Sequence, residues 1–278
     1  LSEEAKGANT IKRDTPIMCV SGNPPYSVSS SNNSPFIEGL VRDYKNGLNE
    51  RNIQPLSDDY IKFIRFSQHL IDKNSYGILG FITNNSYLDG LIHRVMRKSL
   101  LHSFNSIYVV DLHGSTKRKE VAPDGSSDVN VFDIQQGVSI IIAVKNADKQ
   151  GDAPTVRHLD LWGSRAVKNE SLFSLGLENS FEKITPLEPN WYFQPKNFDN
   201  QIAYDQGFSL SEFLQNMKSG IQTKRDSLFI DFDRQALSER METLHSGEAS
   251  VDFCARYKVE NSSSYNLVRR LAESALDP

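Results

Sequence analysis

The chain has 278 residues, of which 38% are hydrophobic, 10% aromatic and 24% charged. This composition supplies enough apolar side chains for a sizeable core and excludes a largely disordered chain. Because the formal net charge is −4, a nucleic-acid partner would have to be met by local basic patches. The two cysteines, Cys19 and Cys254, are too few for a disulfide framework or a four-cysteine zinc site.

The length corresponds to about two domains at roughly 150 residues each. No apolar run approaches the ~20 residues that a membrane span requires, and residues 1–9 lack the apolar centre of a signal peptide. We therefore expect no membrane partner. The chain begins at Leu1 without an initiator Met, as a piece of a longer polypeptide would.

The first half of the sequence alternates short apolar runs with amphipathic segments. Helices are predicted over residues 59–73, where apolar residues recur at helical spacing, and over the basic segment 91–102. Asp58 and Asp59 are interpreted as a cap pair at the start of the first helix. Buried strands are predicted over residues 16–21, 77–83, 106–112 and 138–144. This alternation predicts an α/β domain with a largely parallel sheet.

Two polar segments interrupt the alternation. Residues 27–34 are rich in Ser and Asn and are predicted to form a mobile loop. Residues 114–137 form a long polar loop that carries Lys117, Arg118 and Lys119. A loop of this length in a compact domain is more often functional than filler, so these basic residues are candidate phosphate contacts.

A polar stretch near residue 150 indicates a domain boundary. We assign residues 1–147 to the first domain and residues 148–278 to a second, mixed α/β segment that is less regular. Helices are predicted near residues 210–217, 234–244 and 265–275. Lys224 and Arg225 follow the first of these helices and are further candidate contacts to phosphates or bases.

The tetrapeptide Asn23-Pro24-Pro25-Tyr26 follows the first predicted strand, at the sheet edge where α/β domains bind ligands. The two prolines fix the backbone and leave carbonyl acceptors, and the Asn23 side chain adds another acceptor. Tyr26 supplies a flat ring for stacking. Rigid acceptors beside a stacking surface suit a planar group that carries an NH2, such as adenine.

The exocyclic amine of adenine is a poor nucleophile because its lone pair is delocalised into the ring. Two acceptors on its hydrogens favour the pyramidal amine that forms as it attacks an electrophilic methyl group. The proton can leave after the methyl group has arrived, so no general base is required at the start. The alternative interpretation of the tetrapeptide is an ordinary turn without a catalytic role, since Asn and Pro are common turn formers.

The order of these motifs resembles the adenine-N6 DNA methyltransferases of the Asn-Pro-Pro-Tyr family, in particular those within large single-polypeptide restriction–modification enzymes. The resemblance covers about residues 15–145 and, more weakly, residues 155–230. Besides the tetrapeptide, it is carried by residues 77–86, 107–113, 111–120, 130–132 and 133–137. It implies a partial methyltransferase-like (Rossmann-like) sheet with helices, in which residues 1–147 are the C-terminal half of the catalytic domain.

The resemblance also implies roles for single residues. Asn23 and the Pro24 carbonyl, in the turn shaped by Pro25, would hold the adenine N6 amine. Tyr26 would stack on one face of a base flipped from the duplex. Phe132 matches the family aromatic residue that closes the other face, and it is equally well explained as ordinary core.

Partners and a cofactor follow from the same resemblance. The expected partners are double-stranded DNA and the remaining domains of the parent polypeptide, and the expected cofactor is S-adenosylmethionine. The expected location is the cytoplasm. Residues 220–226 resemble the opening of a target-recognition region, so Lys224 and Arg225 would contact DNA, as would the basic triplet 117–119. The family's glycine-rich cofactor turn normally precedes the tetrapeptide. Only 22 residues precede Asn23, so we expect this chain to lack most of the methyl-donor site.

Two alternatives stay open. The region would act as a DNA-binding or docking module without methylation, or the acceptor amine would belong to cytosine N4, RNA or protein. The basic segment 91–102 is interpreted as a solvated face. No metal site is predicted, because no metal-ligand spacing surrounds the histidines at positions 69, 93, 102 and 113.

Overall fold

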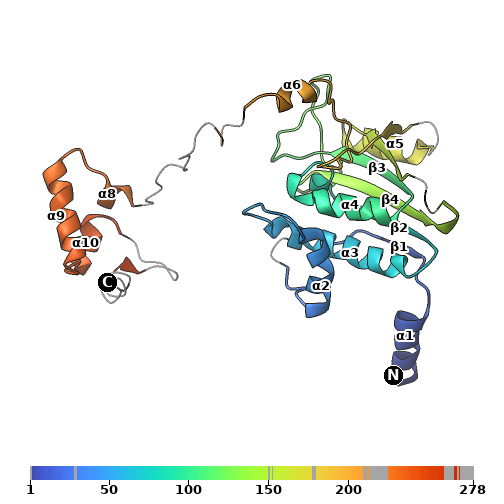
Figure 1. Ribbon diagram of the computed structural model, residues 1–278, viewed down its shortest axis with the longest axis horizontal. Coiled ribbons are helices and arrows are strands. Elements are labelled where there is room, and N and C mark those ends of the chain that lie inside the picture. The colour runs from blue at the N-terminus through green and yellow to red at the C-terminus, as the bar shows by residue number, and fades with distance from the viewer. Residues whose placement is uncertain are drawn as a thin grey trace. The chain divides into compact units, whose positions relative to one another are not determined.

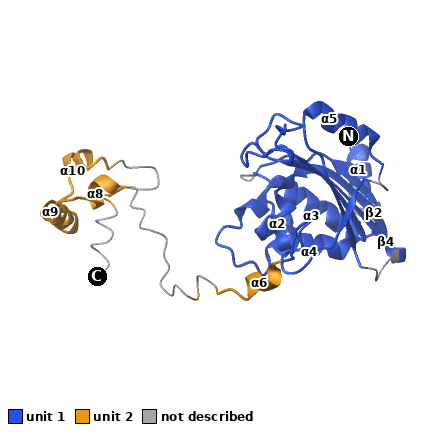
Figure 2. Ribbon diagram, turned by 90° about the horizontal axis from the view of Figure 1, so that it is seen from above, with its two compact units in different colours: residues 1–199 blue, residues 200–278 orange. Residues whose placement is uncertain are grey.

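A computed structural model gives the structure of the protein (Figure 1) and describes residues 2–27, 30–149, 151, 153–176, 180–208, 212, 225–259, 266, 267 and 269. The chain forms two compact units, Leu1–Asp199 and Asn200–Pro278 (Figure 2). Within the described ranges, no helix is long and apolar enough to cross a membrane.

Unit 1 is built around a six-stranded sheet with the order β1-β2-β4-β3-β5-β6. Its strands are β1 (Cys19–Gly22), β2 (Tyr76–Asn84), β3 (Ser106–His113), β4 (Val138–Asn146), β5 (Thr155–Asp160) and β6 (Glu182–Ile184). β1 is parallel to β2, and β3 is parallel to β5, whereas β4 is antiparallel to both β2 and β3. β6 is antiparallel to β5. β1, β2, β3 and β5 therefore point in one direction.

The predicted α/β fold is confirmed. The prediction of a largely parallel sheet is wrong, because most neighbouring strands are antiparallel. Two of the five neighbouring pairs are parallel, because β4 lies antiparallel between β2 and β3. The loop 114–137 joins β3 to β4 without a crossover helix, and such a connection gives an antiparallel pair. The predicted buried strand at residues 16–21 is also corrected: β1 lies at the sheet edge and is mostly exposed.

The helices of unit 1 confirm part of the sequence prediction. They are α1 (Ser2–Asp14), α2 (Pro35–Lys45), α3 (Asp59–Asp72), α4 (Arg94–Ser103) and α5 (Arg165–Ser174). Short 3-10 turns lie at Gln54–Ser57, Asn85–Tyr87, Leu91–His93 and Ala147–Lys149. The predicted helix 91–102 is thus divided into a 3-10 turn and α4. α2 was not predicted from the sequence. It begins after Ser34, whose side chain accepts a hydrogen bond from the Ile37 N–H.

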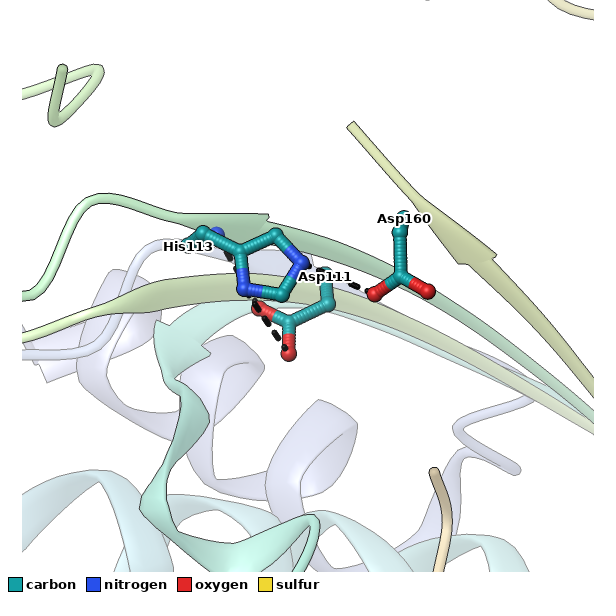
Figure 3. A group of neighbouring side chains, drawn as sticks. All are labelled: Asp111, His113 and Asp160. Atoms are coloured by element: carbon teal, nitrogen blue, oxygen red, sulfur yellow. Dashed lines mark hydrogen bonds and ion pairs between the residues drawn. The ribbon is translucent and has the colours of Figure 1, made fainter. Parts of the chain in front are cut away.

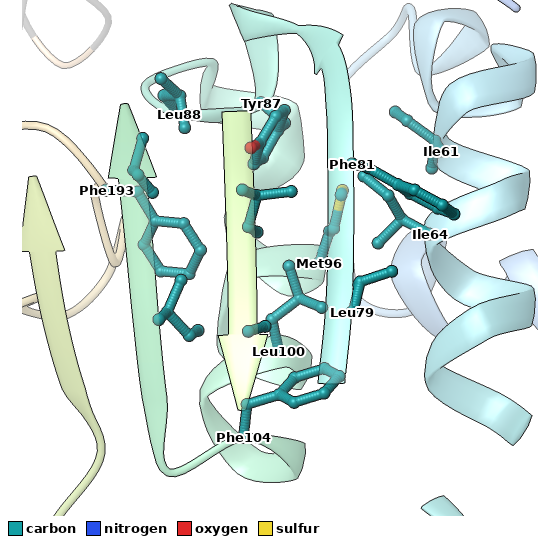
Figure 4. Close-up of a cluster of buried hydrophobic side chains, with 14 of the residues drawn as sticks. Ile61, Ile64, Leu79, Phe81, Tyr87, Leu88, Met96, Leu100, Phe104 and Phe193 are labelled. Carbon is teal, nitrogen blue, oxygen red and sulfur yellow. The ribbon is translucent and has the colours of Figure 1, made fainter. Parts of the chain in front are cut away.

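The two faces of the sheet bury different clusters. On one face, side chains of β2, β3 and β4 pack against side chains of α3 and α4 (Figure 4). This cluster includes Ile61, Ile64, Leu79, Phe81, Met96, Leu100, Val109 and Ile141. On the other face, Val110, Leu112 and Val138 pack with Leu172 of α5. Val109 belongs to the first cluster and Val110 to the second, because successive residues of a strand point to opposite faces.

Unit 2 has a small core of its own. Its described elements are α6 (Gln201–Asp205), α8 (Asp226–Phe229), α9 (Arg234–His245) and α10 (Val251–Arg256). Leu228, Leu244 and Cys254 are buried together. The predicted helix 234–244 is confirmed as α9, whereas the predicted helices 210–217 and 265–275 lie, apart from single positions, outside the described residues.

The compact units divide at Asp199, not at the predicted boundary after residue 147. The reason is the sheet: β5 pairs with β3 and β6 pairs with β5, so both strands extend unit 1. The functional division into residues 1–147 and 148–278 stays a prediction.

His93 gives the fold a pH dependence that can be measured. It is 4% exposed, and burial, together with the charge of Arg97, lowers its pKa to about 4. The unfolded chain takes up a proton near pH 6.5, so the folded state loses stability as the pH falls from about 6.5 to about 4.

We expect this loss to reach about 3 kcal/mol and to disappear in His93→Leu. The measurement is the free energy of unfolding in urea between pH 4 and pH 7. His102→Leu, at an exposed position, is the matched control and should keep the pH dependence. An unchanged pH slope in His93→Leu would contradict this assignment.

Candidate functional site

The Asn23–Tyr26 turn leaves the carboxyl end of β1. Pro24 is buried, Asn23 and Pro25 are exposed, and Tyr26 is half-buried. The Tyr26 hydroxyl donates a hydrogen bond to Asn23 Oδ1 at 3.4 Å, so these two side chains lie together. Burial, with a contribution from Asp58, raises the pKa of Tyr26 to about 12. The phenol therefore keeps its proton at neutral pH and orients the Asn23 oxygen.

Two buried tyrosines link the ring of Tyr26 to the interior of unit 1. Tyr26 packs edge-to-face on Tyr60 with ring centroids 6.1 Å apart, and Tyr60 contacts Tyr87 at 6.2 Å. Tyr60 belongs to α3, while Tyr87 follows β2 and accepts a 3.4 Å hydrogen bond from Ser139 of β4. The position of the Tyr26 ring is thus tied to the helix layer and to the centre of the sheet.

The segment after the turn is held to α3. The Ser27 N–H donates to Asp58 Oδ1 at 2.7 Å, and Lys62 Nζ donates to the Asn32 carbonyl at 2.7 Å and to Asn33 Oδ1 at 3.0 Å. The described residues of the segment 27–34 are thus hydrogen-bonded to the buried side chains of Asp58 and Lys62, and the predicted mobility of this loop stays a prediction.

Further polar residues gather at the same sheet edge. Because β1, β2, β3 and β5 share a direction, their carboxyl ends meet there. Asp111 of β3 is fully buried, and its carboxylate accepts hydrogen bonds from Asn85 Nδ2 (2.9 Å), the His113 N–H (3.0 Å) and Gln194 Nε2 (2.8 Å). These three donors satisfy a buried charge and link β2, β3 and the loop after β6.

Figure 3 shows Asp111 beside His113 and Asp160. The Asp160 Oδ1 atom lies 2.8 Å from His113 Nε2 and 2.9 Å from His158 Nε2. Burial raises the pKa of Asp160, but the hydrogen bonds and charges of the two histidines outweigh it and hold the pKa well below its usual value. The His113 ring also stacks on Trp162, with centroids 3.4 Å apart.

Asp111, His113 and Asp160 are the group of possible metal ligands in the described part of the chain, with one atom of each within 4.8 Å of the others. This group could not be predicted from the sequence, because Asp160 follows His113 by 47 residues and reaches it through strand pairing. Hydrogen bonds occupy the oxygens of Asp111 and join His113 Nε2 to Asp160. The arrangement is a hydrogen-bonded network that fixes the carboxyl ends of β3 and β5.

Phe132 lies in the loop that precedes β4. Its ring is partly buried and packs against the cluster of Val110, Leu112 and Val138, and its N–H donates to Asn130 Oδ1 at 2.8 Å. These contacts agree with a core residue, and its role in closing a base pocket stays a prediction.

The predicted basic contacts are distributed over both units. Lys117, Arg118 and Lys119 are exposed together in one turn, and Arg118 lies 3.4 Å from the Asp89 carboxylate, which offsets its charge. Arg225 precedes α8 in unit 2, and Lys224 lies outside the described residues. Contact of these residues with DNA stays a prediction.

Comparison with known proteins relates this geometry to restriction–modification enzymes. Residues 7–117, which include the turn and the ends of β1, β2 and β3, match the family model "Eco57I restriction-modification methylase". No curated protein is significantly similar to the chain.

The fold is shared with solved structures, among them the following three. The ATP-dependent Type ISP restriction–modification enzyme LlaBIII bound to DNA is 26% identical, with a TM-score of 0.65 over 92% of this chain and 18% of that chain. A nuclease-deletion mutant of the Type ISP enzyme LlaGI with a DNA substrate mimic is 22% identical, with a TM-score of 0.61 over 96% of this chain and 28% of that one. The DrdV–DNA complex is 19% identical, with a TM-score of 0.60 over 98% and 29% of the two chains.

The chain thus spans less than a third of the length of these enzymes. Its first part matches a restriction–modification methylase domain, and the family match and the Type ISP neighbours together support a methyltransferase-related function.

Proposed function

We propose that this chain belongs to a DNA adenine-N6 methyltransferase of a restriction–modification enzyme and provides the part that binds the target amine. The observation that carries the proposal is the placement of Asn23 and Tyr26 together, on a rigid turn at the carboxyl end of β1. We further propose that residues 1–147 form the second half of the catalytic domain, and that residues 148–278 hold the linker and the start of target recognition.

In this proposal, Asn23 Oδ1 and the Pro24 carbonyl accept the two hydrogens of the adenine N6 amine. The Tyr26 hydroxyl donates to Asn23 Oδ1, which turns the amide so that its oxygen faces the site and keeps a second lone pair for the amine. The Tyr26 ring stacks on one face of the flipped base, and Phe132 closes the other face. The acceptors thereby stabilise the amine as it becomes pyramidal.

The methyl donor of this proposal is S-adenosylmethionine. In the described residues before Asn23, the structure holds α1 and β1, with no glycine-rich turn between a strand and a helix. We therefore propose that most of the site for this cofactor lies in the remainder of the polypeptide. Double-stranded DNA is the proposed partner, with Lys117, Arg118, Lys119, Lys224 and Arg225 as contacts to it.

Substitutions of Tyr26 test the proposed stacking. In the complete enzyme, we expect Tyr26→Ala to lower the rate of adenine methylation by about 10- to 100-fold, since base–aromatic stacking is worth roughly 1–3 kcal/mol. Tyr26→Phe keeps the ring and should lose less. The measurement is the transfer of labelled methyl groups to unmethylated DNA.

Tyr204→Ala is the matched control, because Tyr204 of α6 is 82% exposed. It should leave the rate unchanged. Equal rates for wild type and Tyr26→Ala would contradict the role of the ring.

A further inference from the structure

The residue that follows the tetrapeptide is clamped by the start of α3. The Ser27 N–H donates to Asp58 Oδ1 at 2.7 Å, and the Ser27 carbonyl accepts from the Asp59 N–H at 3.2 Å. Asp58 occupies the N-cap position of α3 and is 5% exposed. Its carboxylate therefore bonds a residue 31 positions earlier in the chain, directly behind Tyr26.

The same helix end also holds the Tyr26 ring. Tyr60 lies two residues after Asp58, is 2% exposed and packs edge-to-face on Tyr26. Burial raises the pKa of Asp58, and its hydrogen bond from the Ser27 N–H opposes that rise. The carboxylate thus links the start of α3 to the residue that follows Tyr26.

On its other side the turn is held by β1, a strand of four residues at the sheet edge. A shift of Ser27 would move Tyr26 and, through the 3.4 Å hydrogen bond, the Asn23 oxygen. We propose that Asp58 is a positioning residue that fixes Asn23 and Tyr26 in the geometry that receives the planar amine of a base. This inference rests on the proposed function for its substrate, but its structural part can be tested without it.

Asp59 provides a matched control. It has the same side chain at the next position, but its carboxylate accepts a hydrogen bond from the Ser30 hydroxyl, three residues further from Tyr26 than Ser27 is. Asp59→Asn therefore removes the charge of a neighbouring anchor and leaves the side-chain bond to Ser27 in place.

Three variants of the complete enzyme test the proposal. Asp58→Ser places a residue type that is favoured at the N-cap position but is too short to reach the Ser27 N–H, whereas Asp58→Asn keeps an acceptor of the same length. We expect Asp58→Ser to lower kcat for methyl transfer by on the order of 10- to 100-fold, with little change in the KM for DNA. Asp58→Asn should retain most of kcat, and Asp59→Asn should retain all of it.

A second measurement is independent of methylation. In nuclear magnetic resonance spectra of this chain, we expect the ring contact between Tyr26 and Tyr60 to be lost in Asp58→Ser and kept in Asp58→Asn and Asp59→Asn. An intact ring contact and a wild-type kcat in Asp58→Ser would overturn the proposal. If the wild-type enzyme does not methylate adenine, the proposed function fails, and the ring contact alone then decides whether Asp58 positions the turn.

Discussion

Replacing Asn23 with alanine is expected to lower the rate of adenine methylation by the complete enzyme by on the order of 100- to 1,000-fold, the usual effect of removing one preorganised hydrogen-bonding group. The reason is that Asn23 Oδ1 faces the Tyr26 hydroxyl and is the side-chain acceptor of the turn. Pro24 and Pro25 keep the backbone in place, so the loss comes from the acceptor. The measurement is the initial rate of methyl incorporation at saturating DNA.

Two further variants sharpen this test. Asn23→Asp keeps an oxygen at the same distance and should be less impaired than Asn23→Ala. Asn49→Ala, at an exposed position, should have the wild-type rate. Near-normal turnover of Asn23→Ala would show that the turn does not bind the reacting amine.

The second large effect concerns stability. Lys168→Met is expected to lower the free energy of unfolding of unit 1 by about 3–5 kcal/mol, because it leaves a buried carboxylate without its partner. Lys168 Nζ lies 2.7 Å from Asp128 Oδ1, and both side chains are 0% exposed. The ammonium group also donates to the carbonyls of Leu112 (2.7 Å) and Val129 (2.8 Å). Urea unfolding at pH 7 measures the change.

Lys183→Met is the control, since Lys183 is exposed on β6, and it should change the unfolding free energy by less than about 0.5 kcal/mol. A loss below about 1 kcal/mol in Lys168→Met would contradict the importance of the buried pair. The pair holds the loop 114–137 to α5, so the same variant should also alter the region that carries Phe132 and the basic triplet.

Helices and strands with a strong hydrophobic pattern were predicted from the sequence with nearly correct bounds. The predicted strands 77–83, 106–112 and 138–144 and the predicted helix 59–73 differ from β2, β3, β4 and α3 by one or two residues at their ends. β5 was missed because a histidine, His158, stands at one of its buried positions and breaks the apolar alternation. Its place beside β3 follows from sheet order, which periodicity does not contain.

The tetrapeptide could be located from sequence because its chemistry is local, as four consecutive residues create the turn. The residues that surround the turn could not be located from the sequence, because only tertiary contacts bring them near it. Asp58 was interpreted as a helix cap, and the sequence held no signal for its bond to Ser27, 31 residues away. The network of Asp111, His113 and Asp160 likewise exists only through the pairing of β3 with β5.

The identity of the methylated nucleoside shows which amine the complete enzyme methylates. Unmethylated DNA is treated with the complete enzyme and S-adenosylmethionine, digested to nucleosides and analysed by mass spectrometry, with Asn23→Ala as the paired control. We expect N6-methyladenine from the wild type and its loss in the variant. N4-methylcytosine, or no methylated nucleoside from the wild type, would contradict it.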